Sequence, residues 1–355
     1  MQLPVRGHPL HTRALTLVVE SLSDGRWHAR GDVVDLRKVG FVPMLSDIQP
    51  AGIIHQMSIE LVVDPATTQI DSVEVDQRAV AIEPSESTRG ECCRDPAERL
   101  HALAGERLDG AFARRLSGVF GGPRGCSHLL TLFQLMASGL QRAFVLESEL
   151  GAGASAREVG DRLFRRAAFV EGFEAEDQSI EMAIQLADFH SQPLAPGAAP
   201  TQRLAGQWDA RVFARATGAQ RTLSDLLLAD RMRTGDTLAT ASWRDQSGRL
   251  ATLEGSPIIP GLARRLFEVF DAAEDRLLLD ACLQLAPGFI QVMAAVMDRW
   301  LSGGVPEAPG TVPGPSAAMA EAGSIGGLPD SCYMWRAGGP MASMRTVRQL
   351  EGADE

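Results

Sequence analysis

A cysteine and a histidine stand two residues apart in the segment GGPRGCSHLL, which covers residues 121–130. A glycine-rich turn precedes them, and the apolar run that follows predicts a long helix from about Ser127. A thiol at a helix start feels the positive end of the helix dipole, which lowers its pKa toward the reactive thiolate. We therefore predict that Cys126 and His128 belong to a catalytic site, with Cys126 as nucleophile or polariser.

His55 completes the predicted catalytic set. An imidazole titrates near neutral pH, so His55 or His128 would serve as general acid or base. The turn would also expose backbone N–H groups near Gly122 and Gly125 to a substrate carboxylate or an oxyanion. The guanidinium groups that we expect to clamp such a carboxylate are those of Arg114, Arg115 or Arg336.

The same region offers soft metal ligands, and this leaves an alternative open. Zinc or iron would be bound by thiolate and imidazole groups, with His55 as a further donor. The four ligands of this alternative are Cys93, Cys126, His128 and Cys332. A third interpretation is a non-catalytic binding or scaffold protein, in which the glycine turn merely holds an anion.

Composition limits the partners. The 355 residues carry 34 Lys+Arg against 45 Asp+Glu, a net charge of −11, which argues against nucleic acid or an anionic membrane as the main partner. No apolar run approaches the roughly 18 to 20 residues of a membrane span, and the first residues predict no signal peptide. Five cysteines, two of them adjacent, do not form a disulfide pattern. We expect a cytoplasmic protein with a small-molecule substrate, and a homodimer stays open.

An internal repeat predicts the architecture. The segment ARRLSGVF at 113–120 matches ARRLFEVF at 263–270 in six of eight positions, with an offset of 150. Upstream, Trp27 meets Trp208 and Leu45 meets Leu223, at offsets of 181 and 178 rather than 150. An ordered series of matches indicates a duplicated domain. The predicted fold class is α+β, an antiparallel sheet followed by two helices, twice over.

The expected elements follow from hydrophobic periodicity and turn signals. In the first copy, strands are predicted at 14–20, 27–37, 53–63 and 69–75, and helices at about 111–120 and from 127. In the second, strands are predicted at 179–189, 208–216, 236–244 and 249–253, and helices at 261–270 and 276–300. The predicted segments are a first copy (10–150), a linking helix (151–174), a degenerate second copy (175–301), a flexible Gly/Pro-rich tether (302–327), a closing segment (328–342) and a polar tail (343–355).

The repeat also provides a control on the site. The offset places Arg276 opposite Cys126 and Leu278 opposite His128, while the apolar stripe of the helix is kept. If the thiol and the imidazole served only the fold, the second copy would need them as well. We therefore predict the functional site in the first copy.

With these motifs in view, the chain resembles the bacterial family DUF2889, a domain of unknown function. The motifs that carry the resemblance are His55-Gln56-Met57, the strand from Ile70 to Glu74, a loop cysteine at 92 or 93, the glycine turn with Cys126 and His128, and Cys332 with Arg336 and Gly339. They span about residues 10–145 and 328–342. The intervening second copy departs from the family pattern, so whether the closing segment returns to the first copy is open.

The resemblance implies an association with the breakdown of aromatic compounds. The expected function is thus a catabolic enzyme acting on a small aromatic carboxylated molecule. The sequence shows no P-loop or nucleotide-binding glycine motif, and Lys38 is its only lysine. These observations favour a lyase that needs no cofactor, such as a decarboxylase.

Overall fold

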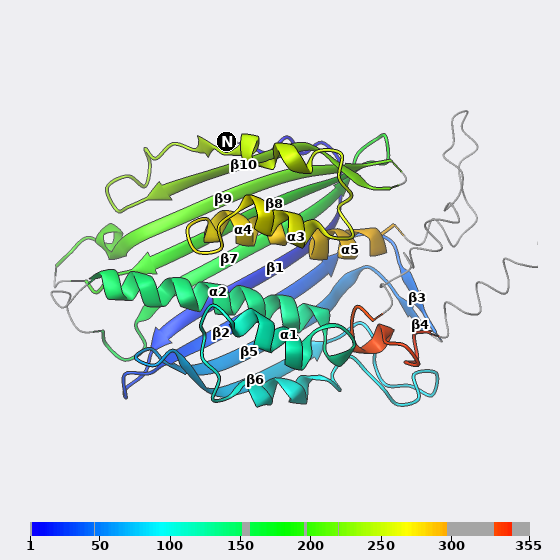
Figure 1. Ribbon diagram of the computed structural model, residues 1–355, viewed down its shortest axis with the longest axis horizontal. Helices are drawn as coiled ribbons and strands as arrows, with labels where there is room; N and C mark the ends of the chain where they lie inside the picture. Colours follow the sequence, from blue (N-terminus) through cyan, green and yellow to red (C-terminus); the bar gives the residue numbers. More distant parts are fainter. Residues whose placement is uncertain are drawn as a thin grey trace, which may run out of the picture.

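A nine-stranded antiparallel sheet forms the body of the molecule (Figure 1). The computed structural model describes residues 2–45, 47–150, 157–194, 197–218, 220–296 and 330–342. Across the sheet the strands follow the order β11-β10-β9-β8-β7-β1-β2-β5-β6. Their bounds are β1 His8–Ser21, β2 Trp27–Arg37, β5 Gly52–Asp64, β6 Gln69–Ala79, β7 Arg162–Glu174, β8 Ile180–Ser191, β9 Leu204–Thr217, β10 Thr222–Arg233 and β11 Arg244–Asp245. A separate small hairpin joins β3 (Val42–Met44) to β4 (Asp47–Gln49).

The described helices α1 to α5 lie over one face of this sheet (Figure 1). They are α1 Phe112–Phe120, α2 Ser127–Leu150, α3 Leu262–Val269, α4 Arg276–Leu283 and α5 Leu285–Ala294. Side chains alternate across a strand, so on β1 Leu15, Leu17 and Val19 are buried toward the helices. The predicted stripe on α2 is buried against them: Leu129, Phe133, Met136 and Leu140. The fold is α+β, as predicted.

The sheet consists of two consecutive meanders that meet at the antiparallel pair β1–β7. β1, β2, β5 and β6 precede a 3-10 helix at Ala97–Leu103, then α1 and α2. β7 to β10 precede a 3-10 helix at Ser247–Leu253, then α3, α4 and α5. We call these the first and second halves.

The predicted linking helix at 151–174 is wrong, because residues 162–174 form β7 near the middle of the sheet. Leu, Arg and Ala favour a helix there, but hydrogen bonding between β1 and β8 overrides this weak propensity. The second half therefore starts at Arg162 rather than at 175.

Two of the strands predicted for the second copy are also wrong. Residues 236–244 are largely turns, with only Arg244 in the two-residue β11, and residues 249–253 lie in the 3-10 helix. The fourth long strand of this half is β10 instead. The match of Trp27 with Trp208 fails as well, since Trp27 begins the second strand of its half and Trp208 lies in the third. The shift in offset that the sequence match required had aligned two strands that do not correspond.

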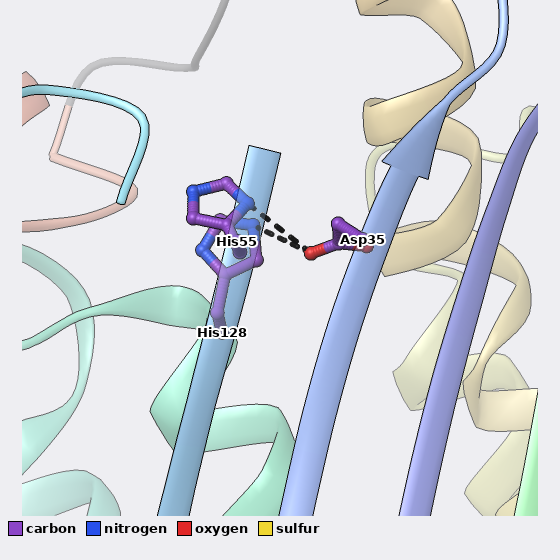
Figure 2. A group of neighbouring side chains, drawn as sticks. All are labelled: Asp35, His55 and His128. Atoms are coloured by element: carbon purple, nitrogen blue, oxygen red, sulfur yellow. Dashed lines mark ion pairs between the residues drawn. The ribbon is translucent and has the colours of Figure 1, made fainter. Parts of the chain in front are cut away.

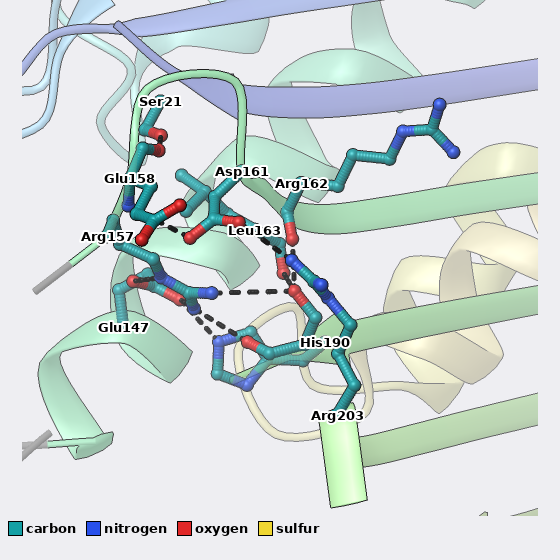
Figure 3. A network of polar contacts seen from close by, with 10 residues as sticks. Ser21, Glu147, Arg157, Glu158, Asp161, Arg162, Leu163, His190 and Arg203 are labelled. Carbon is teal, nitrogen blue, oxygen red and sulfur yellow. Dashed lines mark hydrogen bonds and ion pairs between the residues drawn. The ribbon is translucent and has the colours of Figure 1, made fainter. Parts of the chain in front are cut away.

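A polar network fastens the end of α2 to β8 (Figure 3). His190 Nε2 lies 2.6 Å from Glu147 Oε1, and Arg157 contacts both Glu147 and the backbone oxygen of Ser191. Because α2 carries a site residue in its first turn, this network helps to fix the helix over the sheet.

Residues 330–342, the described part of the closing segment, pack beside the first half and include a 3-10 helix at Tyr333–Trp335. The predicted tether at 302–327 and polar tail at 343–355 lie outside the described residues. Contrary to the expectation from run length, Ser127–Leu150 and Arg276–Ala294 are long and apolar enough to cross a membrane. Over half of each is buried in the molecule, as core helices of a globular fold are.

Candidate functional site

Three buried side chains from three elements converge below the start of α2: Asp35, His55 and His128 (Figure 2). Asp35 on β2 and His55 on β5 are register partners, so both point to the helix-covered face. His128 comes from the first turn of α2. His55 Nδ1 lies 3.2 Å and His128 Nε2 lies 3.5 Å from the same oxygen, Asp35 Oδ2. The three donor atoms all lie within 4.8 Å of one another.

Arg13 on β1 holds the carboxylate from the other side. Its Nε lies 2.8 Å from Asp35 Oδ1 and its Nη2 lies 3.0 Å from Oδ2, both fully out of solvent. Burial raises the pKa of Asp35, but Arg13, His55 and His128 outweigh it and hold that pKa well below its usual value. The site therefore contains an ionised carboxylate at neutral pH.

The imidazole of His128 is neutral in this setting. Burial lowers its pKa well below 6.5, and the neighbouring His55 and Arg13 lower it further, against the attraction of Asp35. His11, whose Nε2 lies 3.4 Å from Asp35 Oδ1, has its pKa lowered by burial to about 4. Neutral imidazoles keep a nitrogen lone pair available for a metal ion or a proton.

Cys126 is not the activated thiolate that its position predicts. Burial raises the pKa of its thiol to about 12, and the backbone N–H of Leu129 lowers it too little to compensate. The Sγ atom lies 3.7 Å from His128 Nδ1. The thiol is thus protonated at neutral pH and serves as a weak partner of the histidine, because desolvation outweighs the helix dipole.

A cavity of about 70 Å³ opens beside the cluster. Its lining includes His55, His128 and all three of Cys93, Cys126 and Cys332. The rest is mainly apolar and comes from four parts of the chain: Val42 and Ile54, Ala81 and Ile82, Ile290 and Ala294, and Tyr333, Met334 and Trp335. Gln291 on α5 also lines it. The site therefore lies between the halves and does not belong to the first copy alone.

The glycine turn contacts the closing segment. Gly125 lines the cavity, but its carbonyl oxygen accepts a hydrogen bond from the Tyr333 N–H at 2.8 Å. Gly122 does not line the cavity, and a Cβ there would lie 3.1 Å from the Asp330 oxygen. Of the two glycines predicted to bind substrate, only Gly125 thus lies on the cavity wall.

The predicted carboxylate clamps lie elsewhere. Arg336 Nη2 lies 2.6 and 2.7 Å from the two carboxylate oxygens of Glu91, and this ion pair fastens the closing segment. Arg114 is exposed on α1, and Arg115 pairs with Glu106 and Asp109. None of the three lines the cavity. Spacing along the chain could not reveal that these side chains face away from the site.

The predicted Cys/His metal set is also not assembled. Within the described part of the chain, the group at ligand spacing is Asp35, His55 and His128. Cys93, Cys126 and Cys332 share the cavity wall with His128 without forming such a group. Sequence reasoning found the two histidines and missed Asp35. The available signal was its place, like that of Arg13, on the inward side of an alternating strand.

A second buried Arg–Asp pair provides an internal comparison. Arg166 on β7 and Asp188 on β8 form the same bidentate contact, at 2.6 and 2.7 Å. Their separation of 22 residues equals that of Arg13 and Asp35. Around this second pair the positions that correspond to His11, His55 and His128 are occupied by Phe164, Trp208 and Leu278. The ion pair serves the fold in both halves, whereas the histidines are particular to the first.

Comparison with protein families places these residues in a recognised region. Residues 11–141 match the family DUF2889, described as a protein of unknown function. The resemblance predicted from the motifs is confirmed for this range. The DUF2889 region includes His11, Asp35, His55 and His128, while Gln291 and the closing segment lie outside it. No curated protein matches the chain.

Proposed function

We propose that this chain is a metal-dependent enzyme acting on a small carboxylated molecule at the Asp35–His55–His128 cluster. The observation that supports it most is the convergence of three buried donor atoms on one point. Two ligands that each lie about 2.0 to 2.2 Å from an ion are about 3.0 to 3.5 Å apart in tetrahedral or octahedral coordination. The distances of 3.2 and 3.5 Å to Asp35 Oδ2 agree with this spacing.

The histidine nitrogens support the same proposal. His55 Nδ1 and His128 Nε2 are buried and make no hydrogen bond of good geometry. A buried polar atom without a partner is costly, and a metal ion would satisfy both at once. Two imidazoles and one carboxylate are a typical donor set for zinc or iron(II), with further positions left for water or substrate.

Charge supports an anionic substrate. Arg13 already neutralises Asp35, so a divalent ion held by Asp35 and two imidazoles would leave an excess of positive charge in a buried site. A substrate carboxylate would compensate this charge. The mainly apolar wall, which includes Ile54, Ile82 and Trp335, is chemically compatible with an aromatic ring, and the cavity of about 70 Å³ would have to widen to admit one.

The proposed reaction class remains that of a lyase, with decarboxylation as its simplest form. The carboxyl carbon would leave as carbon dioxide, and a proton would take its place on the ring. The ion would act as a Lewis acid on the substrate oxygens. A cofactor-independent version is less favoured, because Cys126 is protonated and the pKa of His128 is too low for a general acid at neutral pH.

We further propose that the two halves are copies of one ancestral unit. Both run through four antiparallel strands, a 3-10 helix, a short helix and a long helical stretch in that order. The 3-10 helices begin 150 residues apart, as do α1 and α3. A cytoplasmic location also remains part of the proposal, supported by five cysteines without a disulfide.

Metal analysis of the purified protein tests the central proposal. After removal of bound metal with a chelator, titration with zinc or with cobalt(II) as a spectroscopic probe should show about one ion per chain. His55→Ala and His128→Ala should each abolish or strongly weaken binding, whereas His101→Ala, at an exposed site on the 3-10 helix, should not. Equal affinity in all three variants would exclude the cluster as the metal site.

A further inference from the structure

The sheet face opposite the helices is largely open to solvent over the described residues (Figure 1), except near β10, where the Trp243 ring lies over Arg211 and Arg231. On β1 it consists of Thr12, Ala14, Thr16 and Val18, each partly exposed, which alternate with the buried residues of the core. We call this surface the open face. In the described part of the chain, α1 to α5 all pack on the other side.

The middle of the open face is largely apolar. Strand pairing aligns Phe169 on β7 with Ala14 on β1 and Val34 on β2. The next row aligns Ala167 with Thr16. Phe169 is 46% exposed in the centre of this surface. An exposed aromatic ring among small side chains is typical of a surface that packs against a partner.

The two ends of the open face carry opposite charge. Toward β6, the acidic residues Asp32, Glu60, Glu74 and Asp76 outnumber Arg30 and Arg78. Toward β10, Arg211, Arg231 and Arg233 surround a single carboxylate. That carboxylate, Asp209, pairs with both Arg231 and Arg233, at 2.7 and 2.9 Å. One end therefore has an excess of acid and the other an excess of arginine.

The geometry points to a homodimer in which two open faces pack back to back. The two-fold axis would run parallel to the strands, beneath β1 and β7. This axis exchanges the ends of the sheet, so the acidic end of one copy faces the arginine end of the other. An axis across the strands would place like charges opposite each other, which opposes association.

The strand register determines which charged residues of the two copies face each other. One continuous row of paired residues runs from Asp76 on β6 through Thr16 and Ala167 to Arg231 on β10. The adjacent row runs from Glu74 to Arg233 in the same way. Reversal of each row about the axis places Asp76 near the partner's Arg231, and Glu74 near the partner's Arg233.

The size of the surface suits a stable dimer. Eight long strands at a spacing of about 4.8 Å give a face about 35 Å wide. Such a face can supply the roughly 800 Å² per partner of a standard interface. Two sheets packed face to face with nearly aligned strands are a common arrangement. This inference is independent of the metal-dependent activity, since it concerns the other face of the sheet.

Light scattering coupled to size-exclusion chromatography tests the dimer directly. The full chain at micromolar concentration should have twice the 38.1 kDa mass of one chain. Phe169→Arg should give a folded monomer. Phe267→Arg is the matched control, because Phe267 is 56% exposed but lies on α3, and this variant should remain dimeric. A monomeric wild-type chain, or a dimer broken only by the control, would overturn the inference.

A charge exchange tests the orientation and does not depend on the Phe169 variant folding. Asp76→Arg and Arg231→Asp should each weaken the dimer by about tenfold or more, since each opposes like charges across the interface. The double variant should restore association, because the two reversed charges meet again between copies. Failure of the double variant to recover, with circular dichroism unchanged, would rule out the proposed axis.

Discussion

The rings of His55 and His128 lie with their centroids 3.7 Å apart, although one residue is on β5 and the other on α2. This contact brings one nitrogen of each ring to the same oxygen of Asp35. His55 also lowers the pKa of His128, so the close contact of the two rings favours an unprotonated His128. A protonated pair would repel, whereas a shared metal ion would stabilise the same arrangement.

Substitutions in the two buried Arg–Asp pairs distinguish a role in stability from a role in metal binding. Asp35→Ala should lower the free energy of unfolding by about 3 to 5 kcal/mol, because it leaves Arg13 buried without its counter-ion. Asp188→Ala should cost less, since Arg166 keeps a second carboxylate partner, Asp280, at 2.6 Å. Only Asp35→Ala should also abolish metal binding. Urea denaturation with parallel metal titration measures both effects.

His55→Ala and His128→Ala should affect metal binding strongly and stability only weakly. Each should weaken metal binding by about 100-fold or more and cost only about 1 to 2 kcal/mol of stability in the metal-free protein. The same two measurements on the metal-free and metal-loaded protein check this. A loss of stability as large as that of Asp35→Ala would show that the histidines serve the fold.

The sequence predicts most of the first half. Periodicity gives its four long strands and two helices, and the turn chemistry around Gly125 marks the start of α2. In the second half, residues 162–174 mislead, because their helix-forming composition hides a strand buried between two neighbours. Local propensity cannot anticipate which segment completes a sheet.

For the site, sequence reasoning correctly brought His55, Cys126 and His128 to one cavity. It missed Asp35, whose role depends on register with His55, and Gln291, which arrives from the second half. It also assigned Cys126 a low pKa from the helix dipole, while burial raises that pKa. Pairing and desolvation are properties of the folded chain, and residue spacing does not reveal them.

Acid should lower the free energy of unfolding of the metal-free protein from about pH 6.5 downward. The pKa of His11 is lowered to about 4 in the fold but stays near 6.5 in the unfolded chain, so only the unfolded chain binds a proton between these values. Stability is thus complete above pH 6.5 and falls as the pH drops to about 4, by an amount on the order of 3 kcal/mol from this residue. The lowered pKa of His128 acts in the same direction.

Urea denaturation at several values between pH 7.5 and 4 measures this dependence. His11→Phe should flatten it, and phenylalanine is a suitable replacement because Phe164 stands at the corresponding position of the second half. An unchanged slope in His11→Phe would mean that other groups account for the acid sensitivity.

The ion pair between Arg336 and Glu91 should control access to the cavity thiols. Met334, Trp335 and Met341 form a small apolar cluster with Ile82, apart from the main core, so this segment has few contacts to hold it. Arg336→Ala should raise the alkylation rates of Cys93 and Cys126 by about tenfold or more, because local opening follows local stability.

Peptide mapping after a timed iodoacetamide pulse measures each thiol separately. Cys282, buried in the main core, is the internal control and should stay unreactive in both proteins. Equal acceleration at Cys282 would indicate global unfolding rather than release of the closing segment.

Gly125 should prove necessary for packing. A Cβ at this position would lie 2.1 Å from the Phe120 carbonyl oxygen, so Gly125→Ala must displace the turn that carries Cys126 and the hydrogen bond to Tyr333. We expect a loss of about 2 to 4 kcal/mol of stability, comparable with overpacking of a core, together with faster alkylation of Cys126.

Gly118→Ala is the matched control, since nothing lies within 4 Å of the added carbon on α1. It should be neutral or stabilising by up to about 1 kcal/mol, because alanine favours a helix. Thermal denaturation of both variants decides the matter: if Gly125→Ala keeps its stability and loses only substrate affinity, the turn binds an anion after all.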